Sequence, residues 1–193
     1  MSIDYATRPP HLVRRAERAV EDEAWIKALL HRAAHGVLAT VHEGQPFINS
    51  NLFVYDETAH AIYMHTANVG RTRANVEKND RVCFSVSEMG RLLPADTALE
   101  FSVEYAGVTV FGRAIILTEE GEARHGLQLL LDKYFSHLQS GRDYRPIMPE
   151  ELARTTVYRI QIEQWSGKKK EADADFQDAF FYNDNVFRDD QDQ

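Results

Sequence analysis

The chain has 193 residues, of which 44% are hydrophobic and 27% charged, and its formal net charge is −8 at pH 7. This length supports one well-packed core and leaves little room for a second complete domain. From Glu171 to Gln193, eight acidic residues stand against Arg188 alone, so the acidic excess is concentrated there and residues 1–170 are nearly neutral. A nucleic-acid-binding surface is therefore not expected, because it would normally carry a basic excess.

The cysteine content and the apolar runs of the sequence indicate the cellular compartment in which the protein is expected. Cys83 is the only cysteine, so no intrachain disulfide can form, and the segment RVCFSV around it is typical of a buried strand in a reducing environment. No apolar run approaches the length of a membrane span, and charged residues occupy the N-terminal stretch where a signal peptide would be apolar. We therefore expect a soluble cytoplasmic protein without membrane contact.

The first predicted element is a helix that follows a polar arm of residues 1–20. Residues 21–36 combine an acidic first turn with apolar residues at helical spacing, and Gly36 provides a stop. His31 and His35 stand four apart on this predicted helix, but the sequence offers no third ligand, so we expect a solvated helix face and no metal site.

Strands dominate the middle of the chain. Residues 37–56 predict two strands around a turn at Glu43 and Gly44, and residues 61–67 predict a third. A short helix after Gly70 leads to a fourth strand at residues 82–88. Residues 89–98 contain Gly and Pro and are predicted to form a loop.

The next segment, residues 99–117, is rich in β-branched and aromatic residues and predicts a long curved strand, with Gly107 and Gly112 as bulges or bends. Thr118 is expected to cap a helix over residues 119–138, and residues 155–165 alternate as a last strand. About six strands with short helices between them indicate a mainly β (α+β) fold, a small antiparallel barrel with attached helices.

The segment IYMHTANVGRTRAN, residues 62–75, places polar groups at a corner between a strand and a helix. Strand alternation puts Tyr63 and His65 on one face of the strand. The residues near the end of the strand and the start of the helix are Thr66, Gly70, Arg71 and Arg73. Free N–H groups, the helix dipole and arginine side chains together favour a phosphate. A plain helix start with two solvated arginines is the alternative, and spacing alone does not decide between them.

Two further features of the sequence each allow a functional and a purely structural interpretation. His65 is either a proton-handling group beside an anion site or a strand histidine paired with a neighbour. In EQWSGKKKE, residues 163–171, an indole and lysines could lie beside a bound aromatic anion, or Trp165 could cover the core with the lysines in solvent. These signals taken separately do not define a function.

Taken together, the segments GVLATVHEGQPFINSNLFVY, IYMHTANVGRTRANVEKNDRVCFSVSE, EYAGVTVFGRA and VYRIQIEQWSGK resemble the FMN-binding split barrels related to pyridoxamine phosphate oxidase. Within that superfamily the chain most resembles the Nim-type nitroimidazole resistance proteins. The resemblance runs from about Trp25 to Lys168, and its most specific parts are YMHTANVGR and WSGK. It implies a six-stranded antiparallel split β-barrel over residues 21–170, between the arm of residues 1–20 and an acidic C-terminal tail of residues 171–193.

The resemblance also implies a homodimer that binds FMN in clefts between the subunits. The phosphate end would lie near the corner, and the ring near the second predicted strand. Trp165 and Lys168 would reach the site from the partner subunit. The cofactor-binding residues implied in this way are Asn49, Ser50, Asn51, His65, Thr66, Gly70, Arg71, Arg73, Trp165 and Lys168.

The activity implied is an FMN-dependent oxidoreductase that reduces nitroaromatic or other small acceptors, with His65 as the catalytic residue. Pyridoxamine phosphate oxidases carry an arginine and histidine segment at the C-terminus, whereas this chain turns acidic after Lys170, which argues against vitamin oxidation. The alternatives are a flavin-binding or haem-binding module without turnover, with His65 as a haem ligand, and a structural dimer with an unused pocket. The acidic, aromatic tail is expected to cover the cleft, pack on the partner or remain disordered.

Overall fold

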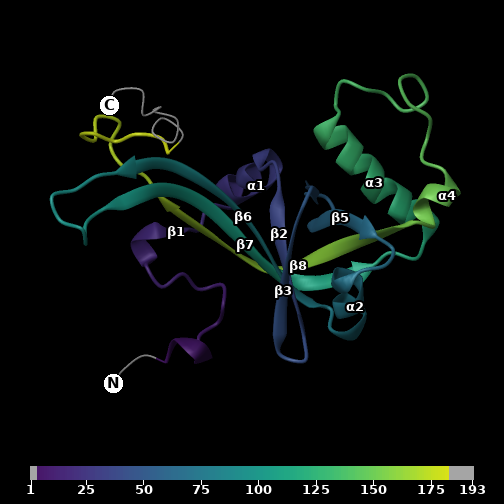
Figure 1. Ribbon diagram of the computed structural model, residues 1–193, viewed down its shortest axis with the longest axis horizontal. Coiled ribbons are helices and arrows are strands. Elements are labelled where there is room, and N and C mark those ends of the chain that lie inside the picture. Colours follow the sequence, from purple (N-terminus) through teal and green to yellow (C-terminus); the bar gives the residue numbers. More distant parts are fainter. Residues whose placement is uncertain (1–3, 183–193) are drawn as a thin grey trace, which may run out of the picture.

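A single antiparallel sheet dominates residues 4–182, the part of the chain that this computed structural model describes (Figure 1). Within those residues its eight strands are β1 (Ala19–Val20), β2 (Gly36–His42), β3 (Gln45–Asn51), β4 (Phe53–Asp56), β5 (Ala61–Ala67), β6 (Arg81–Leu93), β7 (Ser102–Ile116) and β8 (Thr155–Lys170). The hydrogen-bonded order is β3-β2-β6-β7-β8-β5-β4, and β1 pairs with β8. β3 and β4 end this order on opposite sides although only Leu52 separates them, so the sheet curls back on itself.

Helices flank this curled sheet. They are α1 (Glu23–Arg32), α2 (Arg71–Lys78), α3 (Glu120–Tyr134) and α4 (Pro149–Leu152), with the 3-10 turns η1 (Tyr5–Thr7) and η2 (Ala16–Arg18) in the N-terminal arm. No helix of the described residues is long and apolar enough to cross a bilayer. The predicted mainly β barrel with flanking helices is confirmed, and the strand count exceeds six because Leu52 interrupts the second predicted strand and the arm adds β1.

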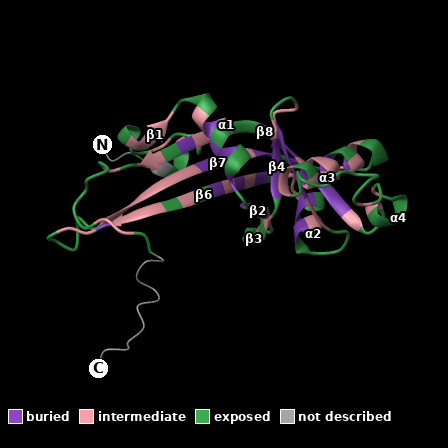
Figure 2. Cartoon of the chain, turned by 90° about the horizontal axis from the view of Figure 1, so that it is seen from above, coloured by how far each residue is buried: buried purple, intermediate pink, exposed green. Residues whose placement is uncertain are grey.

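Two apolar clusters hold the fold together. The larger fills the inside of the curled sheet with residues such as Leu38, Phe53 and Phe84, and α1 closes it with Leu29 and Leu30. The smaller lies between β4, β5 and α3, and contains Val54, Ala61, Tyr63 and Leu130. β5 is therefore buried on both faces over its first four residues, Ala61–Met64. Figure 2 shows that the buried parts of β6 and β7 lie toward the barrel, whereas their far ends are mostly intermediate or exposed.

The distal parts of β6, β7 and β8 leave the barrel as a long ribbon (Figure 1). The predicted loop at residues 89–98 is wrong for its first half, because β6 continues to Leu93 and Leu92 pairs with Val103. The last strand likewise continues beyond Trp165 to Lys170. Cross-strand pairing sustains these polar segments as strands although their sequence resembles a loop.

Only one of the two predicted glycine irregularities occurs. A register shift between Phe111 and Gly112 marks a bulge against β8, and a Cβ on Gly112 would lie 2.0 Å from the carbonyl oxygen of Gln161. Gly107 instead sits in regular register with both Ser87 and Lys168, so a bulge there was wrongly predicted.

Two predicted helix boundaries also need correction. Glu119, rather than Thr118, caps α3, because its carboxylate accepts hydrogen bonds from the backbone N–H groups of Gly121 and Glu122. The helix α1 ends at Arg32, so His35 lies beyond it and does not share a helix face with His31.

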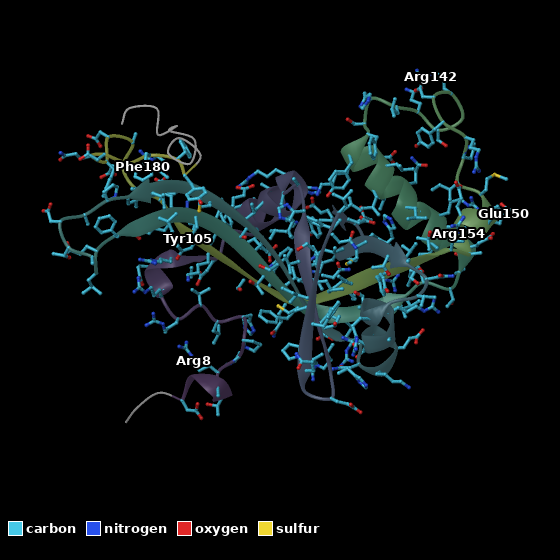
Figure 3. The ribbon with its side chains drawn as sticks, viewed as in Figure 1. Arg8, Tyr105, Arg142, Glu150, Arg154 and Phe180 are labelled. Atoms are coloured by element: carbon cyan, nitrogen blue, oxygen red, sulfur yellow. The ribbon has the colours of Figure 1, made fainter. Side chains whose placement is uncertain are left out.

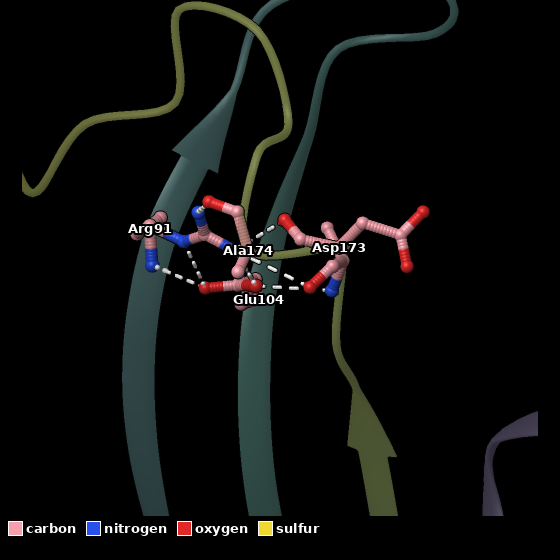
Figure 4. A network of polar contacts seen from close by, with 5 residues as sticks. Arg91, Glu104, Asp173 and Ala174 are labelled. Atoms are coloured by element: carbon pink, nitrogen blue, oxygen red, sulfur yellow. Dashed lines mark hydrogen bonds and ion pairs between the residues drawn. The ribbon is translucent and has the colours of Figure 1, made fainter.

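Two segments near the ends of the described chain pair with the ribbon. β1 places Ala19 opposite Lys168, and the segment after β8 returns to β6, where Phe180 and Leu92 exchange backbone hydrogen bonds of 2.7 and 3.2 Å. Figure 4 shows Arg91 and Glu104 holding this returning segment. The rest of the predicted acidic tail, residues 183–193, lies outside the described residues. The division into three segments, with boundaries at residues 20 and 170, stays a prediction.

Candidate functional site

The predicted site residues gather where the two ends of the sheet meet. β3 approaches β5 here, and the side-chain amide of Asn51 donates a hydrogen bond of 2.7 Å to the backbone carbonyl of His65. Asn51 Oδ1 accepts a hydrogen bond from the N–H of Leu52, the single residue between β3 and β4. Asn51 thus stabilises the split in the barrel through backbone groups.

The corner after β5 has the geometry of an anion cradle. Gly70 precedes α2 with φ of 156°, a value in the region that favours glycine, and a Cβ there would meet no atom within 4 Å. No side chain caps the first turn of α2, so the first backbone N–H groups of the helix receive no side-chain acceptor. The side chain of Arg71 is exposed and makes no hydrogen bond or ion pair with residues 4–182. These groups are available to an anion.

The second arginine of the corner is committed to the protein itself. The guanidinium of Arg73 donates hydrogen bonds to Glu77 at 2.8 Å, and to the carbonyl of Asn68 and the hydroxyl of Thr156 at 3.1 Å each. It therefore braces α2 against β8 and the loop before the helix. Asn49 contacts α2 in a similar way, with Nδ2 at 3.3 Å from the Thr72 hydroxyl.

Strand alternation separates His65 from Thr66. The Thr66 hydroxyl points to the α2 side, where it lies 3.0 Å from the hydroxyl of the buried Tyr158. The His65 side chain points to the opposite face, toward α3. The corner and His65 are thus neighbours in sequence but lie on two sides of β5.

His65 lines a cavity of about 420 Å³ between β5 and α3. The other lining residues are mostly apolar or aromatic and come from α3 and the chain that follows it: Leu52, Leu127, Leu130, Leu131, Tyr134, Phe135, Tyr144, Arg145, Ile147 and Glu151. Arg145 and Glu151 form an ion pair of 3.0 Å, so these two lining charges neutralise each other. The cavity suits an uncharged, planar ligand of modest size.

The electrostatic state of His65 follows from burial. Its Nδ1 atom is buried and, within the described residues, has no hydrogen-bond partner. Burial lowers the pKa of the imidazole below its ordinary value of 6.5. The ring is therefore mostly neutral at pH 7, with one nitrogen that donates a hydrogen bond and one that accepts.

The α3 wall of this cavity was missed by the sequence reasoning. Helix α3 and the residue after it carry more apolar side chains than the smaller core cluster uses, and this excess is a signal that the sequence reasoning did not use. Leu130 both belongs to that cluster and lines the cavity, whereas Leu131 and Phe135 line the cavity without belonging to the cluster.

Three predicted residues lie away from the corner in the same chain. Ser50 alternates with Asn49 and Asn51 and so occupies the other face of β3, where it is exposed. Trp165 packs against His60, with ring centroids 4.7 Å apart, next to the main core. Lys168 lies on the ribbon, with Nζ 5.2 Å from the centroid of the Tyr105 ring.

The fold agrees with comparisons to known proteins. The profile of the family described as pyridoxamine 5'-phosphate oxidase matches residues 22–169. The chain therefore belongs to the pyridoxamine 5'-phosphate oxidase-like family. None of the curated protein sequences matches the chain.

Solved structures share the architecture at low identity. The flavocytochrome Anf3 from Azotobacter vinelandii has a TM-score of 0.73 and 22% identity, over 92% of this chain and 79% of that one. The FAD and haem binding protein from Mycobacterium smegmatis has a TM-score of 0.70 and 20% identity, over 80% and 74%. A candidate 5-nitroimidazole antibiotic resistance protein from Bacteroides thetaiotaomicron has a TM-score of 0.64 and 18% identity, over 79% and 90%. At these identities the likeness establishes the split-barrel fold.

Proposed function

We propose that this chain is an FMN-binding flavoprotein and that the corner between β5 and α2 holds the phosphate of the cofactor. The observation that carries the proposal is the uncapped first turn of α2, with open space at Gly70 and, beside it, the guanidinium of Arg71, which has no partner among residues 4–182. A phosphate with close to two negative charges would find backbone donors and a charged donor there. Membership of the pyridoxamine 5'-phosphate oxidase-like family and the flavin-binding names of two structural neighbours support it.

The other predicted residues would take supporting roles. Arg73 and Asn49 would hold α2 in place through the contacts they already make, and Thr66 would contribute its hydroxyl near the cradle. Asn51 would keep the split open to the flavin ring by fixing the backbone at His65.

We further propose an oxidoreductase activity toward nitroaromatic or other small planar acceptors. A bound flavin would supply the hydride or electrons. His65 would bind the acceptor in the apolar cavity and act as the proton donor. Because the pKa of His65 is lowered, donation from the charged ring requires acidic conditions, and turnover should rise as the pH falls from 8 toward 6. His65→Gln should abolish this rise.

The proposed active form is a homodimer in the cytoplasm. A row of side chains across β3, β2, β6 and β7 is uncovered on the outer face of the sheet: Ile48, Ala39, Cys83 and Phe111. Ile48 is 66% exposed, and a groove of about 420 Å³ lies along this face. A second copy would bury it and could bring Ser50, Trp165 and Lys168 to a shared cofactor site. Ile48→Glu should shift the chain to a monomer in analytical ultracentrifugation.

The test is an absorbance titration of the purified protein with FMN, with equilibrium dialysis to measure the bound fraction. We expect saturation near one FMN per chain, and Arg71→Ala should weaken binding by about 1.5 to 3 kcal/mol, the scale of a hydrogen bond to a charged group. Arg142→Ala, an exposed arginine in the loop between α3 and α4, is the matched control and should bind as the wild type does. Absence of FMN binding, or an Arg71→Ala variant with full affinity, would refute the cradle.

A second candidate is a haem-binding module without turnover. The favouring observation is the unpartnered Nδ1 of His65 beside an apolar cavity, which is a suitable setting for a haem ligand. The same absorbance spectra distinguish haem binding from flavin binding. A single intense Soret band that His65→Ala removes would support haem, whereas flavin bands alone would exclude it. A chain that binds neither would be a structural dimer with an unused pocket.

A further inference from the structure

A second hollow lies on the ribbon, between the N-terminal arm and the distal part of β8. Its volume is about 490 Å³. We call it the arm basin, and its lining residues are Val13, Arg14, Arg15, Arg18, Leu99, Glu100, Phe101, Ser102, Lys168 and Lys170. Five of these side chains are basic and only Glu100 is acidic, in a chain whose net charge is −8. This local surplus of positive charge is therefore not a property of the surface in general.

The arm is held in this position by pairing with the ribbon. β1 adds to the edge of β8, with Ala19 opposite Lys168 and Val20 opposite Gly167. A Cβ on Gly167 would lie 2.9 Å from Cβ of Val20, so this approach needs a glycine. The pairing fixes the arginines that precede β1 on one wall of the basin and the lysines of β8 on the other.

Most of these cations have no anionic partner. Within residues 4–182, the guanidinium groups of Arg14 and Arg15 make no hydrogen bond or ion pair, and both side chains are exposed. The Lys170 ammonium contacts the hydroxyl of Ser102, and Lys168 has no carboxylate partner among the described residues. Arg18 has only the exposed Glu17 at 3.9 Å.

Tyr105, on the ribbon strand β7, lies beside the basin and contacts a cation of each wall (Figure 3). Arg18 donates a hydrogen bond of 3.3 Å to the Tyr105 hydroxyl, and Lys168 lies over its ring. Burial opposes ionisation of this phenol, but the Arg18 hydrogen bond and Lys168 outweigh it and lower its pKa. Tyr105 thus connects Arg18 of one wall with Lys168 of the other.

The rim of the basin is apolar and exposed. Phe101 is 59% exposed and Leu99 is 94% exposed, immediately beside the basic walls. A flat ring can stack on Phe101 while a phosphate group enters the basin. The hollow is too small to follow a nucleic-acid duplex, and cations on two facing walls match two linked phosphates better than one.

We propose that the arm basin binds the diphosphate group of a nucleotide, with the base against Phe101. The ligand is an adenosine-diphosphate type of group, either as a free nucleotide or as part of a dinucleotide. The phosphate contacts proposed for the basin differ from those of the FMN cradle, since they come from the arm and the ribbon and use no residue of α2. Lys168 is the one basin residue that is also a candidate for the shared cofactor site of a dimer.

The experiment is isothermal titration calorimetry of the full chain at 150 mM NaCl with ADP, inorganic pyrophosphate and FMN. ADP and pyrophosphate are expected to bind, and Arg14→Ala or Arg15→Ala should each weaken both about tenfold, with FMN affinity unchanged. Arg154→Ala removes the same charge at the opposite end of the molecule (Figure 3) and should leave ADP binding intact. Phe101→Ala should weaken ADP binding but not pyrophosphate binding.

A further titration with the dinucleotide FAD shows whether the ligand of the basin is a free nucleotide or part of a dinucleotide. FAD that binds more tightly than both FMN and ADP would assign the basin to the second half of a dinucleotide, whereas ADP alone would assign it to a free nucleotide. No binding of ADP or pyrophosphate, an equal loss in Arg154→Ala, or binding of a single-stranded oligonucleotide in place of ADP would each overturn the proposal. If the wild-type chain binds ADP but not FMN, the proposed FMN cradle is refuted and the proposal for the arm basin is retained.

Discussion

The ion pair between Arg91 and Glu104 allows a quantitative prediction about the ribbon. Glu104 accepts hydrogen bonds from Nη2 of Arg91 at 2.7 Å, from Nε at 2.9 Å and from its backbone N–H at 3.1 Å. The N–H of Ala172 donates a further one of 2.9 Å, and Arg91 bonds the carbonyls of residues 172–174 in turn (Figure 4). Both side chains are less than one fifth exposed, at 19% and 16%.

These contacts lower the pKa of Glu104 from 4.5 to about 2, chiefly through the Arg91 hydrogen bonds and then that of Ala172. At 1.36 kcal/mol per pKa unit the full shift would correspond to about 3.4 kcal/mol. Screening near the surface reduces this figure, and we expect Glu104→Gln to lower the free energy of unfolding by about 1 to 2 kcal/mol at pH 7. Because the folded-state pKa is lowered, this stability is present above pH 4.5 and is lost as the pH falls toward 2.

The assay is urea unfolding of the wild type and Glu104→Gln at pH 7 and pH 3, together with hydrogen exchange at Ala172. Glu88→Gln is the matched control, because its partner Arg32 forms a more exposed pair and the loss should stay below about 1 kcal/mol. The reasoning fails if Glu104→Gln loses as much stability as the wild type between pH 7 and pH 3, or if the Ala172 amide exchanges no faster in the variant.

Three other predictions concern single residues. Burial lowers the pKa of Lys133 to about 8, so the wild type should gain stability as the pH rises from 8 toward 10.5, and Lys133→Met should lose this gain in urea unfolding. Gly112→Ala should cost about 2 to 3 kcal/mol by clashing with the Gln161 carbonyl, whereas Gly107→Ala, whose Cβ would lie 3.5 Å from its nearest neighbour, should cost much less by the same assay. Burial raises the pKa of the Cys83 thiol, so iodoacetamide at pH 7.5 should alkylate the folded chain about tenfold more slowly than the urea-unfolded chain, and equal rates would contradict this.

The sequence predicted elements with strong local signals and missed those that depend on distant pairing. The short helix after Gly70 and the strand at residues 61–67 were identified, because a glycine corner and apolar alternation are local. The extension of β6 through Met89–Leu93 was not, because this segment becomes a strand only by pairing with β7. The local signal for the bulge at Gly112 is a glycine inside a strand, but Gly107 is a glycine inside the same strand and has no bulge.

The candidate site was predictable to a similar degree. Placing Thr66, Gly70 and Arg71 at one corner needed only the order of strand and helix. That Arg73 is bound to Glu77 and Thr156 could not be inferred, because Thr156 comes from β8, far along the chain. The cavity at His65 also required the position of α3, which packing between distant segments determines.

The position of β8 in the sheet has a consequence for synthesis of the chain. β8 is the last strand of the described residues, yet it pairs with both β7 and β5 in the interior of the sheet. Until the ribosome has released Thr155–Lys170, β5 and β7 each present an unpaired edge, and the barrel cannot close. A nascent or truncated chain that ends before Thr155 should therefore be prone to edge-to-edge aggregation, because closure of the barrel requires the whole of β8.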